Sequence, residues 1–198
     1  MRNTYLLLGV TFLIVIGGAW YAFNRSSTQD VDTSESMAST LTLTSFAFEN
    51  NGNIPPTFTC DGEEVNPALS ISGVPEGTKS LALIMDDPDI PQVFKDQRGI
   101  DSFDHWTLFN IPPGTREIAQ GSTVGVVGVN GADKNGYAGP CPPPQYEPSM
   151  HRYFFRLYAL NTMLELPEGA SKADVLKAMQ GHVIERAELI GRYKRVAQ

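Results

Sequence analysis

Hydrophobic and polar residues alternate along much of the chain after residue 40. A period of two places successive side chains on opposite faces of a β-strand. Together with short apolar runs, this alternation predicts strands at 41–48, 80–85, 104–111, 152–160 and 185–192. The run 80–85 is apolar except for Ser80, which predicts a buried strand. The run 152–160 contains the most apolar residues of the set and predicts a central strand.

The pattern near residue 171 predicts a short helix instead. Ser171 and Asp174 form a capping pattern before the residues at 175–179, and Gly181 follows near the helix end. Clusters of Gly, Pro and Asn separate the strands. Five or more strands, one or two short helices and many such turns predict a mainly β fold, an antiparallel β-sandwich.

The first 40 residues do not share this pattern. Residues 5–23 contain no charge and follow Arg2, and their number fits a single membrane-spanning helix. A removed signal peptide is the alternative, although the end of the apolar run offers only a poor cleavage site. Residues 24–40 are polar and predict a flexible linker. The expected organisation is therefore an anchor or signal peptide at 1–23, this linker, and a folded domain at 41–198.

Both interpretations of residues 5–23 send the domain across the membrane, because Arg2 and the free amine tend to stay on the cytoplasmic side. We therefore expect an extracytoplasmic location, in the periplasm or on the outer face of the cell membrane, with residues 5–23 retained as the anchor.

Composition narrows the class of function. The chain has 198 residues and a net charge of −7. This is the wrong sign for a protein held on nucleic acid through its phosphates, so we expect no nucleic-acid partner. An apolar content of 41% excludes a disordered chain, and the length favours one full domain.

Several polar residues lie where predicted strands begin or end. They are Asp86, Asp87, Asp89, His105 and His151. A stiff loop rich in Pro and Gly, at 136–144, precedes the last of them. Together these features indicate a site. Alternatively, each polar group caps its own turn, the aspartates through local backbone hydrogen bonds.

The sequence favours some chemistries for such a cluster over others. Asp and His side chains ligate metals, but no HExxH or His-x-His spacing occurs, so we expect no metal or other cofactor. A serine hydrolase needs a nucleophile elbow, and G-x-S-x-G is absent. An acid–base pair of His105 and His151 lacks an activated nucleophile, so we do not expect an enzyme. The last alternative is an anion pocket of imidazoles and loop N–H groups, in which carboxylates fix the imidazole tautomers.

Cys60 and Cys141 are the two cysteines of the chain, and both lie in polar loops. Cys141 beside His151 is a candidate nucleophile. However, two cysteines in an exported domain most often pair, so we expect a Cys60–Cys141 disulfide. In the chain-entropy model, closing so long a loop contributes about 4 kcal/mol or more.

Four motifs follow one another along the domain. They are DPD at 87–89, DHW at 104–106 leading to NIP at 110–112, GY with GPCPP at 136–143, and HRY at 151–153. With the segments 60–67 and 187–193, they resemble the phosphatidylethanolamine-binding protein (PEBP) family, in its bacterial Raf-kinase-inhibitor-like (YbhB/YbcL-type) branch. The resemblance covers about 41–195. Cys141 interrupts the Gly-Pro-Pro pattern of eukaryotic members. Secreted bacterial relatives often have a cysteine at the same position.

The resemblance implies a β-sandwich with a small surface pocket for phosphate-like anions and phosphorylated head groups. Carried over by motif, the pocket residues are Asp87, Asp89, His105, Gly139, Pro140, Pro142, Pro143 and His151, with Tyr153 as a weaker candidate. Residues 92–100 form an insertion beside this pocket. Asp86 and His182 lie outside the motifs and are assigned structural roles.

These observations favour a non-enzymatic binding protein for a phosphorylated or phosphoethanolamine-like ligand, exported and tethered to the membrane. The alternative is an inhibitor or regulator of a protein partner, such as an envelope protease or a kinase, through the same pocket rim. The negative net charge argues against broad attraction to anionic lipids, so any lipid binding has to be specific to the pocket.

Overall fold

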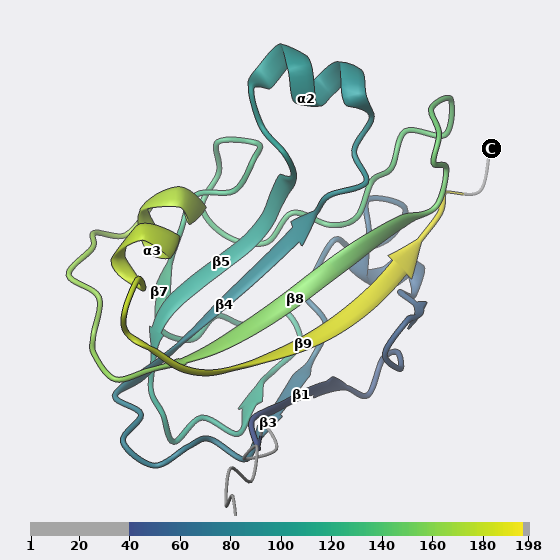
Figure 1. The fold of residues 1–198 in the computed structure, drawn as a ribbon. Helices are drawn as coiled ribbons and strands as arrows, with labels where there is room; N and C mark the ends of the chain where they lie inside the picture. The colour runs from purple at the N-terminus through teal and green to yellow at the C-terminus, as the bar shows by residue number, and fades with distance from the viewer. Residues whose placement is uncertain (1–39, 196–198) are drawn as a thin grey trace, which may run out of the picture. The chain divides into compact units, whose positions relative to one another are not determined.

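A computed structural model of the chain describes residues 40–195 (Figure 1). The predicted anchor or signal peptide at 1–23 lies outside the described residues, and so does the predicted linker except for Thr40. Within 40–195, no helix is long and apolar enough to cross a membrane.

Two β-sheets form the domain. The larger sheet has the order β2-β9-β8-β4-β5-β7. Its strands are β2 (Gly52–Asn53), β4 (Ser80–Asp87), β5 (Phe103–Ile111), β7 (Val126–Val127), β8 (His151–Leu160) and β9 (Val183–Tyr193). The smaller sheet, in the order β1-β3-β6, consists of β1 (Thr42–Ser45), β3 (Leu69–Ser72) and β6 (Glu117–Ile118). The helical elements are η1 (Pro56–Phe58), α2 (Gln92–Arg98) and α3 (Lys172–Ala178).

The main hydrophobic core lies between the two sheets. The smaller sheet contributes Leu43 and Ile71, and the larger sheet contributes Leu83, Trp106 and Leu157, all of them buried. Side chains along β8 alternate between buried and more exposed, as the period of two predicts, whereas β4 is buried along its whole length. The predicted mainly β, antiparallel sandwich is therefore confirmed.

Helix α3 covers part of the outer face of the larger sheet (Figure 1). Val175 shares a second apolar cluster with Ala82 and Ile84 of β4, so β4 is covered on both faces. The predicted capping box is present at the helix start. Ser171 Oγ accepts a hydrogen bond from the Asp174 N–H at 3.1 Å, and the Asp174 carboxylate accepts one from the Ser171 backbone N–H.

The structure corrects several local predictions. Strand β1 ends at Ser45, and the predicted continuation to 48 is wrong because the chain leaves the sheet there, with Phe46 92% exposed. Strand β9 begins at Val183, two residues before its predicted start at 185. The insertion at 92–100 contains α2, which was not predicted. One pairing, between β2 and β9, is parallel, although all the other strand pairs within 40–195 are antiparallel.

Candidate functional site

Three strand ends bring the predicted polar residues together. Asp87 is the last residue of β4, His105 lies near the start of β5, and His151 is the first residue of β8. Because β4 is antiparallel to both of its neighbours, its end lies beside the beginnings of β5 and β8. Residues far apart in the sequence therefore meet at one end of the larger sheet.

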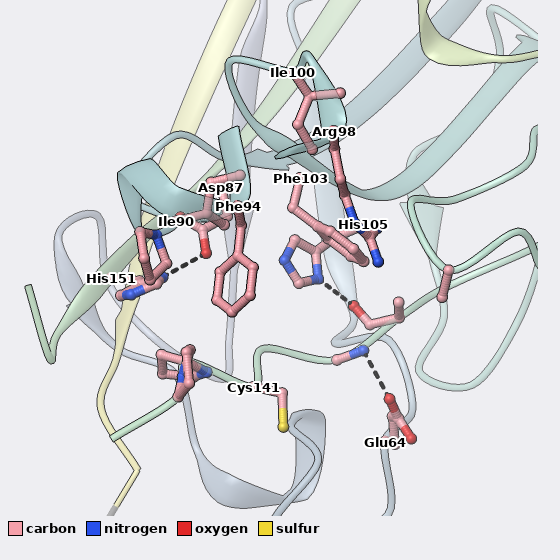
Figure 2. A pocket seen from close by; sticks show the side chains of 16 residues that line it. Glu64, Asp87, Ile90, Phe94, Arg98, Ile100, Phe103, His105, Cys141 and His151 are labelled. Carbon is pink, nitrogen blue, oxygen red and sulfur yellow. Dashed lines mark hydrogen bonds and ion pairs between the residues drawn. The ribbon is translucent and has the colours of Figure 1, made fainter. Parts of the chain in front are cut away.

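These side chains line a cavity of about 370 Å³ (Figure 2). A volume in this range is typical of sites for small organic ligands. The predicted site residues that line it are Asp87, His105, Gly139, Pro142, Pro143 and His151. The other lining residues are Glu64, Ile90, Pro91, Phe94, Arg98, Ile100, Phe103, Ala132, Ala138 and Cys141.

Asp87 holds the His151 imidazole in a fixed orientation. His151 Nδ1 lies 2.6 Å from Asp87 Oδ2, and both side chains are almost completely buried. The second carboxylate oxygen of Asp87 accepts the Asp89 N–H at 2.8 Å. Since a carboxylate only accepts, Nδ1 of His151 carries the hydrogen of this bond. The other ring nitrogen, Nε2, is buried and has no hydrogen-bond partner in the described part of the chain.

His105 is the second imidazole of the cavity wall. Its Nδ1 lies 2.7 Å from the carbonyl oxygen of Ala138, and because a carbonyl only accepts, Nδ1 is the donor. Burial lowers the pKa of His105 below its usual value, although the bond to Ala138 acts in the opposite direction. The neutral ring is thereby favoured, with Nε2 as a hydrogen-bond acceptor.

Tyr153 supports both imidazoles from behind. Its ring lies edge-on to His105, with the centroids 5.1 Å apart, and is stacked with His151 at 6.4 Å. The side chain is completely buried and does not line the cavity. Burial raises the pKa of the Tyr153 hydroxyl far above its usual value, so the phenol stays protonated.

A disulfide fastens the loop at 138–143 that lines the cavity. Cys60 and Cys141 are bonded, with their Cα atoms 5.4 Å apart, which confirms the predicted pair. The Cys60 N–H also donates to the carbonyl oxygen of Pro140 at 3.2 Å. Cys141 therefore has no free thiol, and its alternative assignment as a nucleophile is wrong.

Gly139 occupies a position in this loop with little room for a side chain. Its N–H donates to Glu64 Oε1 at 3.2 Å. A Cβ added here would lie 3.0 Å from both Thr59 Cα and Glu64 Cγ, closer than nearly all such contacts. The absence of a side chain lets the loop approach the segment at 59–64.

Three of the predicted site residues do not line the cavity: Asp89, Pro140 and Tyr153. Asp89 instead forms a bidentate ion pair with Arg152, in which both N–O distances are 2.7 Å. Hydrogen bonds from Arg152 lower the pKa of Asp89. A ligand-binding role for any of the predicted residues stays a prediction.

Much of the apolar lining of the cavity was not predicted from the sequence. Ile90, Phe94, Ile100 and Phe103 line it and are half-buried. Phe94 and Ile100 lie in the insertion at 92–100, whose scattered apolar residues show no periodicity, and Ile90 and Phe103 lie outside the four motifs. Arg98 was not predicted either, because an exposed charged residue in the sequence is not distinguishable from other surface residues without the fold.

Two further polar residues take part in contacts away from the cavity. Asp86 forms ion pairs with Arg156 and Lys172, and His182 Nδ1 lies 2.9 Å from Asn161 Oδ1. Across residues 40–195, no group of three or more His, Cys, Asp or Glu side chains is arranged to hold a metal ion.

Comparison with known sequences identifies the family. Residues 44–194 match the model of the family described as phosphatidylethanolamine-binding protein. A UPF0098 protein of Methanothermobacter thermautotrophicus is 47% identical over 162 residues, covering 78% of this chain and 99% of the relative. A UPF0098 protein of Aquifex aeolicus is 42% identical over 156 residues, covering 75% and 85%.

Solved structures agree with this match. A PEBP homologue from Chlamydia trachomatis is 39% identical with a TM-score of 0.73, covering 80% of this chain and 100% of that chain. YbcL of E. coli, described as a member of the mammalian PEBP family, is 28% identical with a TM-score of 0.69, covering 79% and 99%. The chain belongs to the phosphatidylethanolamine-binding protein family, and the likeness to YbcL agrees with its bacterial branch.

Proposed function

We propose that this protein is a non-enzymatic binding protein whose cavity takes a small phosphorylated ligand, such as phosphoethanolamine or a related anion. The observation that carries this proposal is the Nε2 atom of His151, which is buried and lacks a partner among the described residues. A protonated imidazole donates a strong hydrogen bond to a phosphate oxygen. Arg98 adds a positive charge to the lining, and the description of the family supports the same class of ligand.

The composition of the cavity supports binding rather than catalysis. Each carboxylate oxygen of Asp87 accepts a hydrogen bond within the domain, one from the His151 ring and one from the Asp89 N–H. Cys141 is oxidised in a disulfide, and the described lining contains no Ser or Thr. With no activated nucleophile among these residues, we expect no turnover.

The test is titration calorimetry of the full chain in a mild detergent, with inorganic phosphate, phosphoethanolamine and glycerophosphoethanolamine. We expect saturable binding that is lost in His151→Gln. His182→Gln is the matched control, because His182 contacts Asn161 away from the cavity. Near-ultraviolet circular dichroism checks that each variant is folded. Equal binding by His151→Gln, or no binding by the wild type, would overturn the proposal.

We further propose that the domain is exported and tethered to the membrane by residues 5–23. The Cys60–Cys141 disulfide supports an oxidising compartment, and the length of the uncharged run supports a retained anchor. Intact mass spectrometry of the membrane fraction should give a mass that includes residues 1–23. Protein with free thiols in the cytoplasmic fraction would contradict export, and a mass that lacks residues 1–23 would contradict the anchor.

A second candidate function is inhibition of a protein partner, such as a protease, through the rim of the cavity. Exposed apolar side chains favour it: Val93 on α2 is 41% exposed and Tyr146 is 37% exposed. Tyr146 contacts the cavity residue Phe94 edge-on, with the ring centroids 5.5 Å apart. A photo-crosslinking amino acid at position 93 should capture this partner in cells, whereas the same group at Met163, a residue also exposed but on the β8–α3 connection, should not. Equal capture at both positions would count against the rim.

A further inference from the structure

The cavity has an apolar part that a phosphate ion alone does not use. Ile90, Phe94 and Ile100 come from the segment 90–100, which contains α2, and Phe103 begins β5. All four side chains are half-buried, so each keeps apolar surface exposed to water in the empty cavity. Figure 2 shows the ring of Phe94 projecting into the cavity between the labelled His151 and His105.

The volume of the cavity also favours a ligand larger than phosphate. At about 370 Å³ it lies within the range of sites that hold organic molecules, and such sites combine apolar walls with a few polar groups. A lone phosphate fills only part of this space. Covering the remaining apolar surface with a ligand group removes it from water, which is favourable roughly in proportion to the area buried.

Arg98 supplies a positive charge that the domain itself does not neutralise. Within the described residues, the interaction of its guanidinium is one hydrogen bond, from Nη1 to the carbonyl oxygen of Gly131 at 3.1 Å. The carboxylates of the lining are engaged elsewhere: Asp87 with His151, and Glu64 with the Gly139 N–H. An anion in the cavity therefore has an unpaired cation available to it.

We propose, building on the proposed function, that the ligand is an organic phosphate monoester with a compact apolar body, about the size of a phenyl or hexyl group. Its phosphate accepts a hydrogen bond from His151 Nε2 and is neutralised by Arg98. Its apolar body packs against Ile90, Phe94 and Ile100. The segment 90–100 is thus the element that recognises the ligand body, and His151 and Arg98 recognise its phosphate.

Calorimetry of the full chain with phenyl phosphate and with inorganic phosphate tests this assignment. In the wild type we expect phenyl phosphate to bind at least tenfold more tightly than phosphate. Phe94→Ala should weaken phenyl phosphate much more than phosphate and so remove most of that advantage. Val93→Ala is the matched control, because Val93 lies on the same helix but does not line the cavity. Ile100→Ala provides a second variant with the same expectation if Phe94→Ala does not fold.

The charged group is tested separately. Arg98→Gln should weaken both phosphate and phenyl phosphate severalfold, with a smaller loss at high salt because exposed charges are screened. Arg116→Gln is the control, since Arg116 is also an exposed arginine and donates to backbone carbonyls away from the cavity. Equal affinities of wild type and Arg98→Gln would overturn the role of Arg98.

The outcomes separate this inference from the proposed function. If phosphate binds through His151 but phenyl phosphate binds no more tightly, the apolar recognition is wrong and the anion pocket stands. If neither binds, both fail. A series of alkyl phosphates defines the size: affinity should rise about fourfold per CH₂ up to hexyl and then level off. A rise that continues to decyl phosphate would indicate a chain lying outside the cavity and would overturn the compact ligand.

Discussion

Asp87 Oδ2 and His151 Nδ1 lie 2.6 Å apart, although 64 positions separate the two residues in the sequence. This bond decides which nitrogen of His151 is left without a partner among the described residues. The other oxygen of Asp87 accepts the Asp89 N–H, so each carboxylate oxygen has one hydrogen-bond partner within the domain. Asp87 therefore orients the His151 ring, and under the proposed function His151 is the residue that binds the ligand.

Asp87→Asn should reverse the tautomer of His151. The amide keeps the size of the carboxylate, and its carbonyl oxygen can still accept the Asp89 N–H. Its NH₂ group then faces His151 Nδ1, so the ring hydrogen must move to Nε2. Long-range ¹H–¹⁵N NMR of the imidazole measures this directly. Asp101→Asn, at an exposed position, is the control. A variant that keeps its hydrogen on Nδ1 would show that Asp87 does not set the tautomer.

The polar residues of the cavity could be predicted from the sequence, but their arrangement could not. Alternation along 151–153 already implies that His151 and Tyr153 share one face of the strand and that Arg152 lies on the other. Asp89 forms an ion pair with Arg152, and its side chain therefore lies away from the cavity. This pairing was not predictable, because it depends on how β8 lies beside β4, and periodicity within one strand says nothing about its neighbours.

His105 should make the domain less stable in mild acid. Burial lowers its pKa in the folded state, so between that value and the usual value of about 6.5 the unfolded chain binds more protons. Stability therefore falls as pH drops below about 6.5, by at most about 1.4 kcal/mol per pH unit, and levels off below the folded pKa. Urea unfolding from pH 7.5 to 5 measures the effect.

The comparison that isolates His105 is His105→Gln, whose free energy of unfolding should depend less on pH over this range. His182→Gln should keep the wild-type slope, because His182 is exposed and lies elsewhere. Asp89 does not interfere, since its lowered pKa confines its contribution to more acidic solutions. Parallel pH profiles for wild type and His105→Gln would contradict this prediction.

Long and regular strands could be predicted from the sequence, whereas short or irregular elements could not. The strands at 80–85, 104–111 and 152–160 were found because each is a long, apolar run, and the structure extends them by no more than two residues. Strand β2 and strand β6 are two residues long and have no period to detect. Helix α2 was missed because it contains no buried residue, so no apolar stripe marks it.

Removing the disulfide should cost about 4–5 kcal/mol of stability. Cys60 and Cys141 are 81 positions apart, and the chain-entropy model gives a loss of this size when such a loop is opened. Guanidinium unfolding of Cys60→Ala/Cys141→Ala should reveal it. Wild-type protein treated with a reductant is the control and should match the double variant. A loss below about 1 kcal/mol would mean that the unfolded chain gains little freedom when the bond is absent.

Lys172 should stabilise the packing of α3 through a cluster of charges outside the cavity. Asp86 and Asp104 are cross-strand partners on β4 and β5, so their like charges face each other. Lys172 Nζ lies 3.2 Å from Asp86 Oδ2 and 2.7 Å from Ser102 Oγ, and it also forms an ion pair with Asp104. Lys172→Met should therefore destabilise the domain by about 1–3 kcal/mol, less than for a fully buried pair because the side chains are partly exposed.

A double-mutant cycle with Asp104→Asn separates this interaction from the packing of the lysine stem. If the two charges interact, the double variant should be more stable than the sum of the single losses implies, by at least about 0.5 kcal/mol. Lys177→Met is the control on the same helix, and it should change the free energy of unfolding by no more than about 0.5 kcal/mol because Lys177 is exposed. If the two residues interact, each single variant already loses the ion pair, so the losses cannot simply add in the double variant. Strictly additive losses would therefore show that Lys172 acts through its apolar stem.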